Sequence, residues 1–496
     1  MANLELESDS YDVVVIGTGV SHSIAAAALA KAGKTVLHLD PNDYYGGDQA
    51  SLTLDELSEW IKRQPEAGQA EGVVAYSNAS STALTPALEA DRRRYSLSLF
   101  PALIPSRGSL IETLISSDVG KYVSFKLLDS VSIWNQEQGA PQRVPGSKED
   151  VFKDRSVTLL DKRKLMKFLL FAAGEFEESE ILRGKEDQPL LQLLQDSFGL
   201  SPQLAASITY AIAHCESPDD KSLPSLIRTR RYLRSIGRYG PSSFLVGQYG
   251  GAGEVAQGYC RGCAVFGGTY VLGSPSIPTS CVITETSATI SIPCHPRPVT
   301  ANHIIASTDY LPPAALTKDG TLSSPATVFA HCIAITSSLP DVLRRSRAIE
   351  SQEVDQDEND DTSLLVFPPE GDNPLVRCLI NGEGTGSCPA GQYIIYLYAS
   401  SDTSSDPSAL LRPYLHRLSD RPTFEAYYTC SRKSAQETAS TPHAVVLRPY
   451  PGKELLTEGL DWEAQEGERV FYEVMGRDGK TFFESEEADV GDSQDE

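Results

Sequence analysis

Apolar and polar positions along the first forty residues follow the order strand, helix, strand. Residues 13–16 are apolar and β-branched, and residues 35–39 are largely apolar, which is typical of buried parallel strands. Residues 24–31 between them are rich in alanine and predict a helix. The pattern therefore predicts a βαβ unit near the N-terminus.

From about residue 157 the apolar positions recur at helical intervals. Leu165, Phe168 and Ala172 share one face of a predicted helix, and two further helical stretches follow, separated at Gly199. We expect an all-helical domain over residues 151–238.

After residue 240 the pattern returns to short apolar runs. We expect strands within residues 281–292, 327–336, 364–367 and 392–399. The fold class is therefore α/β, with the helical domain inserted into a discontinuous domain made of residues 1–150 and 239–480.

Three polar segments interrupt this organisation. Residues 64–94 lack periodicity and predict a flexible insertion, as do residues 350–363, which begin with the acidic run ESQEVDQDENDD. Residues 481–496 are expected to form an acidic, disordered tail.

Composition narrows the classes of partner. The formal net charge of −24 and a pI near 4.8 disfavour nucleic acid, whose phosphates repel such a surface. Nine scattered cysteines, an acidic N-terminus and the lack of an 18-residue apolar run indicate a cytosolic chain whose membrane contact is indirect.

The turn after the first strand is a candidate dinucleotide site. Gly17 permits a tight turn, Gly19 permits close approach of a pyrophosphate, and Asp40 ends the second strand where it could accept ribose hydroxyls. His22 replaces the third glycine of the fingerprint, and we expect it at the surface of the helix start. A structural turn in an inherited fold is favoured over bound flavin or nicotinamide, so no cofactor is expected.

Three long blocks carry a resemblance to a known family. They are YDVVVIGTGVSHSI with PNDYYGGDQASLT, then SLSLFPALIPSRGSLIETLISSDVGKYVSFK, and SIGRYGPSSFLVGQYGGAGEVAQGYCRGCAVFGGTYVLGSP. The chain resembles the superfamily of Rab GDP-dissociation inhibitors and Rab escort proteins, whose flavoprotein-like fold binds small GTPases. RVPGSKEDVF, LLDKRKLMKFLLF and the Cys260-x-x-Cys263 pair resemble the escort branch.

The resemblance implies a role without bond-making chemistry. An escort protein binds newly made, GDP-bound Rab GTPases and presents them to the α/β heterodimer of Rab geranylgeranyl transferase. It then shields the geranylgeranyl group until the Rab reaches a membrane. No catalytic residue and no metal site are expected. The alternatives are an inhibitor that recycles prenylated Rab and, less favoured, a flavin-dependent oxidoreductase.

The resemblance also indicates which residues contact the GTPase. Positions matching the family's binding patch are Tyr45, Glu254, Gln257, Arg261 and Tyr270. An arginine can donate to carboxylate or carbonyl oxygens, and a tyrosine offers apolar area with a polar tip. The alternative is that both tyrosines are ordinary half-buried residues and that Glu254 pairs with Arg261.

The resemblance also implies a second set of residues that contact the GTPase. Arg238, Tyr239 and Tyr249 match a mobile loop that contacts Rab and its C-terminal tail, although anchoring of the loop to the core is equally compatible.

In the helical domain we expect a groove for the lipid and a docking face for the transferase. The candidates for that face are Phe168, Phe171 and Arg183. Helical spacing alone would place both phenylalanines in the core.

Overall fold

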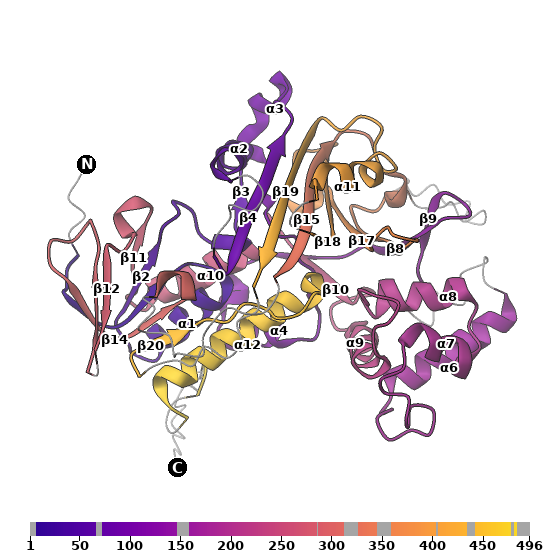
Figure 1. The fold of residues 1–496 in the computed structure, drawn as a ribbon, viewed down its shortest axis with the longest axis horizontal. Coiled ribbons are helices and arrows are strands. Elements are labelled where there is room, and N and C mark those ends of the chain that lie inside the picture. The colour runs from indigo at the N-terminus through magenta and orange to yellow at the C-terminus, as the bar shows by residue number, and fades with distance from the viewer. Residues whose placement is uncertain are drawn as a thin grey trace, which may run out of the picture.

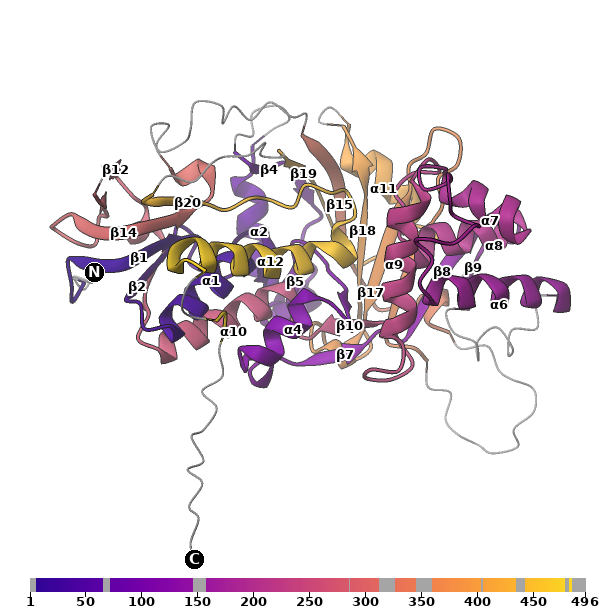
Figure 2. The same ribbon diagram turned by 90° about the horizontal axis from the view of Figure 1, so that it is seen from below.

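The computed structural model describes residues 6–65, 72–145, 158–284, 286–311, 326–344, 359–402, 405–433, 442–477 and 481–483. Two large sheets lie side by side, a block of helices lies beyond the second, and a long C-terminal helix passes beneath them (Figures 1 and 2).

The helices are named by their bounds. They are α1 (Val20–Lys31), α2 (Leu54–Arg63), α3 (Pro86–Asp91), α4 (Ser109–Ser116), α6 (Leu159–Ala173), α7 (Leu190–Phe198), α8 (Pro202–Ala206), α9 (Ser222–Ser235), α10 (Ala252–Val265), α11 (Pro407–Leu415) and α12 (Leu455–Met475). A π-helical turn, η4 (Ser207–Ile212), follows α8.

The predicted βαβ unit is confirmed and lies in a seven-stranded sheet. The strands are β1 (Ser10–Ile16), β2 (Val36–Asp40), β11 (Thr269–Leu272), β12 (Ser280–Ile283), β13 (Ala288–Ser291), β14 (Val299–Ala306) and β20 (Ala444–Val446). β11, β2, β1, β14 and β20 run parallel, and residues 13–16 of β1 are fully buried. Burial from both faces explains why these strands are apolar without alternation.

The second sheet has eight strands. They are β4 (Val74–Ser81), β8 (Ser130–Asn135), β9 (Ala140–Arg143), β15 (Thr327–Thr336), β16 (Thr362–Phe367), β17 (Val376–Asn381), β18 (Tyr393–Ser401) and β19 (Phe424–Arg432). Small ladders join β3 (Ser51–Leu52) to β5 (Leu97–Ser98), and β6 (Ile104–Pro105) and β7 (Phe125–Leu127) to β10 (Phe244–Gly247).

The expectation of a flexible insertion over residues 64–94 was wrong for its described part. β4 pairs with β19 along residues 74–81, and α3 follows it. Ala75 and Ser77 are buried while their neighbours are only partly so, which is the two-residue alternation of a half-buried strand. The polar composition concealed this pattern. Residues 66–71 lie outside the described residues.

Two segments predicted to be flexible or disordered are partly built into the fold. Asp360 is buried, and Asp361 pairs with Lys126 at 3.0 Å before β16 begins. At the C-terminus the Phe483 ring is buried near the Tyr259 ring, so residues 481–483 are packed rather than disordered. The rest of both predicted segments, residues 350–358 and 484–496, lies outside the described residues.

The helical block α6–α9 shares one apolar core with the eight-stranded sheet. A buried charge crosses this junction. Arg377 of β17 is 1% exposed, and its guanidinium donates to the Glu216 carboxylate and to the carbonyl oxygens of His214 and Cys215. These bonds hold the segment between η4 and α9 against the sheet.

The helix α12, which the sequence pattern did not predict, joins several parts of the molecule. From below it runs past α1 and α4 toward α9 (Figure 2). Asp461 accepts hydrogen bonds from the Leu110 amide of α4 at 2.9 Å and from Arg231 of α9 at 3.1 Å. Glu466 is 2% exposed and binds both Arg448 and Arg469.

Loss of the Arg377 cation should destabilise the chain strongly. Arg377→Met leaves Glu216 and two carbonyl oxygens without their buried donor, which costs about 3–5 kcal/mol of unfolding free energy. Urea denaturation measures it. Arg344→Met is the control, because among the described residues that exposed arginine pairs with the exposed Asp341, and a change within about 0.5 kcal/mol is expected. Equal effects of the two substitutions would contradict a structural role for the Arg377 cation.

Acid should destabilise the chain through His331. This ring stacks on Tyr428 at 4.9 Å, and burial lowers its pKa to about 3. Below about pH 6.5 the imidazole of His331 is protonated in the unfolded chain but stays neutral in the folded chain. The folded state therefore loses stability as the pH falls from about 6.5 toward 3. His331→Phe keeps a stacked ring and should remove about 2 kcal/mol of the loss at about pH 5. Wild-type and variant stability curves that stay parallel between about pH 7.5 and 5 would refute this effect.

Candidate functional site

Helix α10 carries most of the predicted GTPase-contact residues. It begins after Gly250 and Gly251, whose positive φ angles of 90° and 80° allow the chain to turn sharply out of β10. Gly258 lets α10 pack closely on the segment after α4, because a Cβ there would lie 2.9 Å from Val119. The outer face of α10 is thereby fixed beside β11 and the loop after β2.

The structure brings five predicted residues into one pocket of about 270 Å³. Glu254, Gln257 and Arg261 come from α10, Tyr270 from β11 and Tyr45 from the loop after β2. We call this pocket, lined also by Tyr122, Gly258, Cys260 and Ala264, the platform pocket. Residues more than 200 positions apart in sequence thus form one surface.

The charged groups of the platform pocket remain available. Among the described residues no ion pair joins Glu254 to Arg261, so the alternative that they pair with each other is not observed. Arg261 is exposed and its guanidinium lies 4.6 Å from the centroid of the Tyr122 ring. Burial raises the pKa of the Glu254 carboxyl. A cation stacked on an aromatic face keeps its donors free for a partner's oxygens.

Sequence reasoning missed Tyr122 as a member of this site. It is 44% exposed and lies after α4, inside the block GKYVSFK. That block carried part of the family resemblance, but nothing in its local pattern indicates that the tyrosine faces α10.

The predicted loop residues lie elsewhere. Tyr239 lines an apolar groove of about 560 Å³ together with Ile115, Phe125 and Leu127, and Arg238 lies over the Tyr239 ring at 5.5 Å. Tyr249 is 51% exposed, has a φ of 52°, and its amide donates to the Thr385 carbonyl oxygen at 2.9 Å. None of these three residues lines the platform pocket.

The candidates for transferase docking differ in accessibility. Phe168 is fully buried and packs edge-on against Phe198, so its assignment to a docking face was wrong, and helical spacing had indicated core correctly. Phe171 is partly buried between Phe176 and Phe198. Arg183 is exposed.

The glycine turn has the shape of a dinucleotide site. Gly17 has a φ of 108°, and Gly19 precedes α1 without a side-chain cap. Asp40, however, accepts from the amide and hydroxyl of Thr18 at 2.7 and 2.6 Å and from the Asn42 amide at 2.8 Å. Its oxygens therefore bind the protein's own turn.

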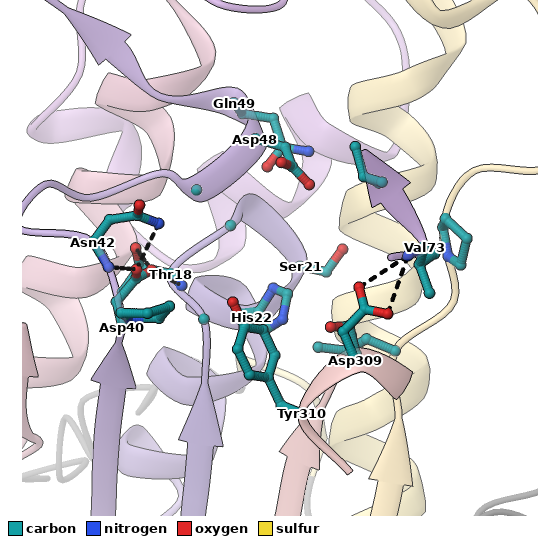
Figure 3. A pocket seen from close by; sticks show the side chains of 18 of the residues that line it. Thr18, Ser21, His22, Asp40, Asn42, Asp48, Gln49, Val73, Asp309 and Tyr310 are labelled. Carbon is teal, nitrogen blue, oxygen red and sulfur yellow. Dashed lines mark hydrogen bonds between the residues drawn. The ribbon is translucent and has the colours of Figure 1, made fainter. Parts of the chain in front are cut away.

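His22 lies over the turn instead of at the surface. Figure 3 shows its ring in the middle of the pocket, near Tyr310. Cβ atoms placed on Gly17 and Gly19 would lie 2.9 and 3.1 Å from the ring nitrogens, so the ring covers the face of both glycines. The missing third glycine is thus replaced by a side chain that fills the approach of a pyrophosphate.

Side chains of the protein itself accept hydrogen bonds from the backbone amides at the start of α1. Glu463 of α12 accepts from the Ser21 amide at 3.2 Å and from the Ser21 hydroxyl, and the Gln49 side chain donates to Glu463 at 3.1 Å. A carboxylate here occupies the position that favours an anion at a helix N-terminus. The space left around the turn is about 270 Å³, less than most sites for organic ligands. These residues do not fit a flavin or nicotinamide dinucleotide.

Two further features bear on chemistry. Within the described ranges, no group of three or more His, Cys, Asp or Glu side chains is arranged to hold a metal ion. Over the same residues, no helix has the length and apolar character needed to cross a membrane.

Sequence comparisons agree on one family. A family model described as GDP dissociation inhibitor matches residues 7–343. The chain is 30% identical over 412 residues to the Rab proteins geranylgeranyltransferase component A of Saccharomyces cerevisiae, covering 81% of this chain and 63% of the yeast protein. It is 29% identical over 451 residues to the protein of that name from Drosophila melanogaster, covering 87% and 83%. The alignment thus spans less than two thirds of the yeast relative's length.

Solved structures confirm the expected fold. A Rab GDI from Plasmodium falciparum superposes with a TM-score of 0.66 at 17% identity, covering 95% of this chain and 99% of that chain. An oxidoreductase from Methanosarcina mazei superposes with a TM-score of 0.55 at 15% identity, covering 91% and 98%. This architecture is thus shared by a Rab GDI and by an oxidoreductase.

Removal of the Glu463 carboxylate should destabilise the junction of α1 and α12. Glu463→Ala leaves the Ser21 amide and the Gln49 side chain without their acceptor, which costs about 1–3 kcal/mol of unfolding free energy. Thermal and urea unfolding measure the loss. Glu468→Ala, an exposed position on the same helix, is the control and should change stability by less than about 0.5 kcal/mol. An unchanged Glu463→Ala variant would show that the carboxylate does not support the turn.

Proposed function

The chain belongs to the GDP dissociation inhibitor family, and we propose that within this family it works as a Rab escort protein. In this role it binds newly made, GDP-bound Rab GTPases and presents them to the α/β heterodimer of Rab geranylgeranyl transferase. It then shields the geranylgeranyl group on the way to a membrane. The names of its yeast and fly relatives support this role.

The platform pocket is the observation that carries the proposal. Five residues assigned to GTPase contact from sequence alone lie together on α10, β11 and the loop after β2. The platform presents Arg261 over the Tyr122 ring, and no ion pair engages this arginine among the described residues. Arginine and tyrosine at the centre of a patch are the residue types that dominate binding energy at protein interfaces.

The groove beside Tyr239 supports binding of an extended segment. Ile115 is 58% exposed and Tyr239 is 48% exposed along this apolar groove, which lies on the face formed by α4, β7 and β10. A Rab tail carrying apolar residues would bury this surface.

The helical block supports contact with the transferase and the lipid. On α6, Leu159, Leu160 and Leu170 are 79%, 62% and 56% exposed, next to lysines and an arginine. Exposed leucines on a helix whose other face is core are typical of a surface that meets a partner. Phe171 and Arg183 remain candidates for docking, and the lipid groove remains a prediction.

The role requires no bond-making chemistry in this chain. We propose that it is a non-catalytic accessory subunit acting in the cytosol and visiting membranes only transiently. An inhibitor that recycles prenylated Rab would use the same platform, and the Rab GDI fold is shared. The difference is whether the helical block engages the transferase.

Reconstituted prenylation tests the proposal. Unprenylated Rab–GDP, the transferase heterodimer and labelled geranylgeranyl diphosphate are mixed with and without the chain, and label on Rab is followed. We expect labelling that depends on the chain. Extraction of prenylated Rab from membranes without any support of prenylation would instead identify an inhibitor.

Substitution in the platform pocket should weaken the complex. Arg261→Ala removes the cation at its centre and should lower affinity for Rab–GDP by about 10- to 30-fold, as loss of an interface arginine does. Fluorescence titration with labelled Rab measures it. Arg421→Ala, an exposed arginine of the turn after α11, is the control. Equal affinities of both variants would place the interface elsewhere.

A further inference from the structure

The hydroxyl of Tyr270 is directed into the protein. Tyr270 lies opposite His38 in the parallel pairing of β11 with β2. The Tyr270 oxygen is 3.1 Å from His38 Nδ1, and His38 Nε2 is 2.6 Å from the carbonyl oxygen of Gly17. His38 is fully buried. One imidazole therefore joins the glycine turn to a residue of the platform pocket.

Hydrogen-bond chemistry fixes the direction of both contacts. A carbonyl oxygen can only accept, so His38 Nε2 carries the hydrogen and donates it to Gly17. Nδ1 of the neutral ring is then an acceptor, and the Tyr270 hydroxyl must donate to it. Burial lowers the pKa of His38 to about 4, which keeps the ring neutral near pH 7.

Two buried cysteines lie on the protein side of the Tyr270 hydroxyl. The thiols of Cys260 and Cys263 interact electrostatically with the Tyr270 hydroxyl, and the Cys260 sulfur lies 3.2 Å from the Ser23 hydroxyl oxygen. A thiol is a weak donor, and burial raises the pKa of both, to about 12 and about 11, so they stay protonated. The Cys260-x-x-Cys263 pair thus lies behind the tyrosine.

We infer that His38 is a positioning residue of the platform pocket, holding Tyr270 so that its ring, and not its hydroxyl, faces the bound GTPase. This inference rests on the proposed function. It corrects the sequence-based view that the tyrosine offers a polar tip to the partner. The edge-on Tyr45 ring, 6.0 Å away between centroids, completes the apolar surface.

The glycine turn then has a structural role that needs no bound nucleotide. The Gly17 carbonyl that accepts from His38 belongs to a residue with a φ of 108°, a conformation that favours glycine. The Gly17 carbonyl oxygen orients the His38 imidazole, and the imidazole in turn orients the Tyr270 hydroxyl.

Two substitutions at His38 separate its two hydrogen bonds. His38→Asn retains an acceptor near the position of Nδ1, whereas His38→Gln retains a donor near the position of Nε2. We expect His38→Gln and Tyr270→Phe each to weaken Rab–GDP binding by roughly tenfold, and His38→Asn by clearly less. Thermal unfolding of each variant reports any loss of the fold itself.

A double-mutant cycle distinguishes positioning from general destabilisation. His38→Gln combined with Tyr270→Phe should weaken binding no more than the worse single variant, because both remove the same hydrogen bond. Multiplied effects, of roughly a hundredfold, would overturn the inference, as would unchanged binding by His38→Gln. A wild-type chain that bound no Rab would overturn the proposed function itself, which is a different result.

The tautomer of His38 can be measured without any substitution. Nitrogen-15 spectra of the wild-type chain should show the hydrogen of His38 on Nε2 at neutral pH. A hydrogen on Nδ1 would make the ring donate to Tyr270, free the tyrosine hydrogen for a partner and overturn the inference.

Discussion

The relative positions of the glycine turn, α4, α9 and α12 depend on hydrogen bonds and ion pairs that the carboxylates of α12 accept. Asp461 binds α4 and α9, Glu463 binds the start of α1, and Glu466 binds two arginines beside it. Asp461 and Glu466 are buried and Glu463 is partly buried, and a carboxylate removed from water without a donor is costly, so each group requires its partner element to lie in one place. One helix near the C-terminus therefore fixes the positions of the glycine turn and the helical block relative to each other.

The proposed escort role requires the chain to hold two partners at once, and this constraint would serve that role. The platform pocket lies on α10, which packs against α1, and the proposed transferase face lies on α6, which packs against α9. Arg231 of α9 binds α12, and Arg377 ties the segment before α9 to the sheet. In the proposed role, such a junction would hold a bound GTPase at a fixed distance from a bound transferase.

The dinucleotide turn shows how an inherited fold serves a different purpose. His22 covers the glycines, Asp40 binds its own turn, and Glu463 takes the place favourable to an anion. The sequence disfavoured a bound cofactor because His22 replaces the third glycine of the fingerprint. It could not predict Glu463, because more than 400 residues separate that carboxylate from the turn and α12 has no motif that points to it.

The sequence by itself determined the βαβ unit, several strands of the two large sheets, the helical block and the identity of five platform residues, because these depend on local periodicity or on long motifs. It misjudged residues 64–94, where a polar composition conceals the alternation of β4, and it proposed Phe168 as a surface residue although its ring is buried. Only the tertiary structure decided that Tyr122 joins the platform and that the Tyr270 hydroxyl faces His38. Those outcomes depend on contacts between side chains of strands and helices that are distant in sequence, and a local sequence pattern does not predict such contacts.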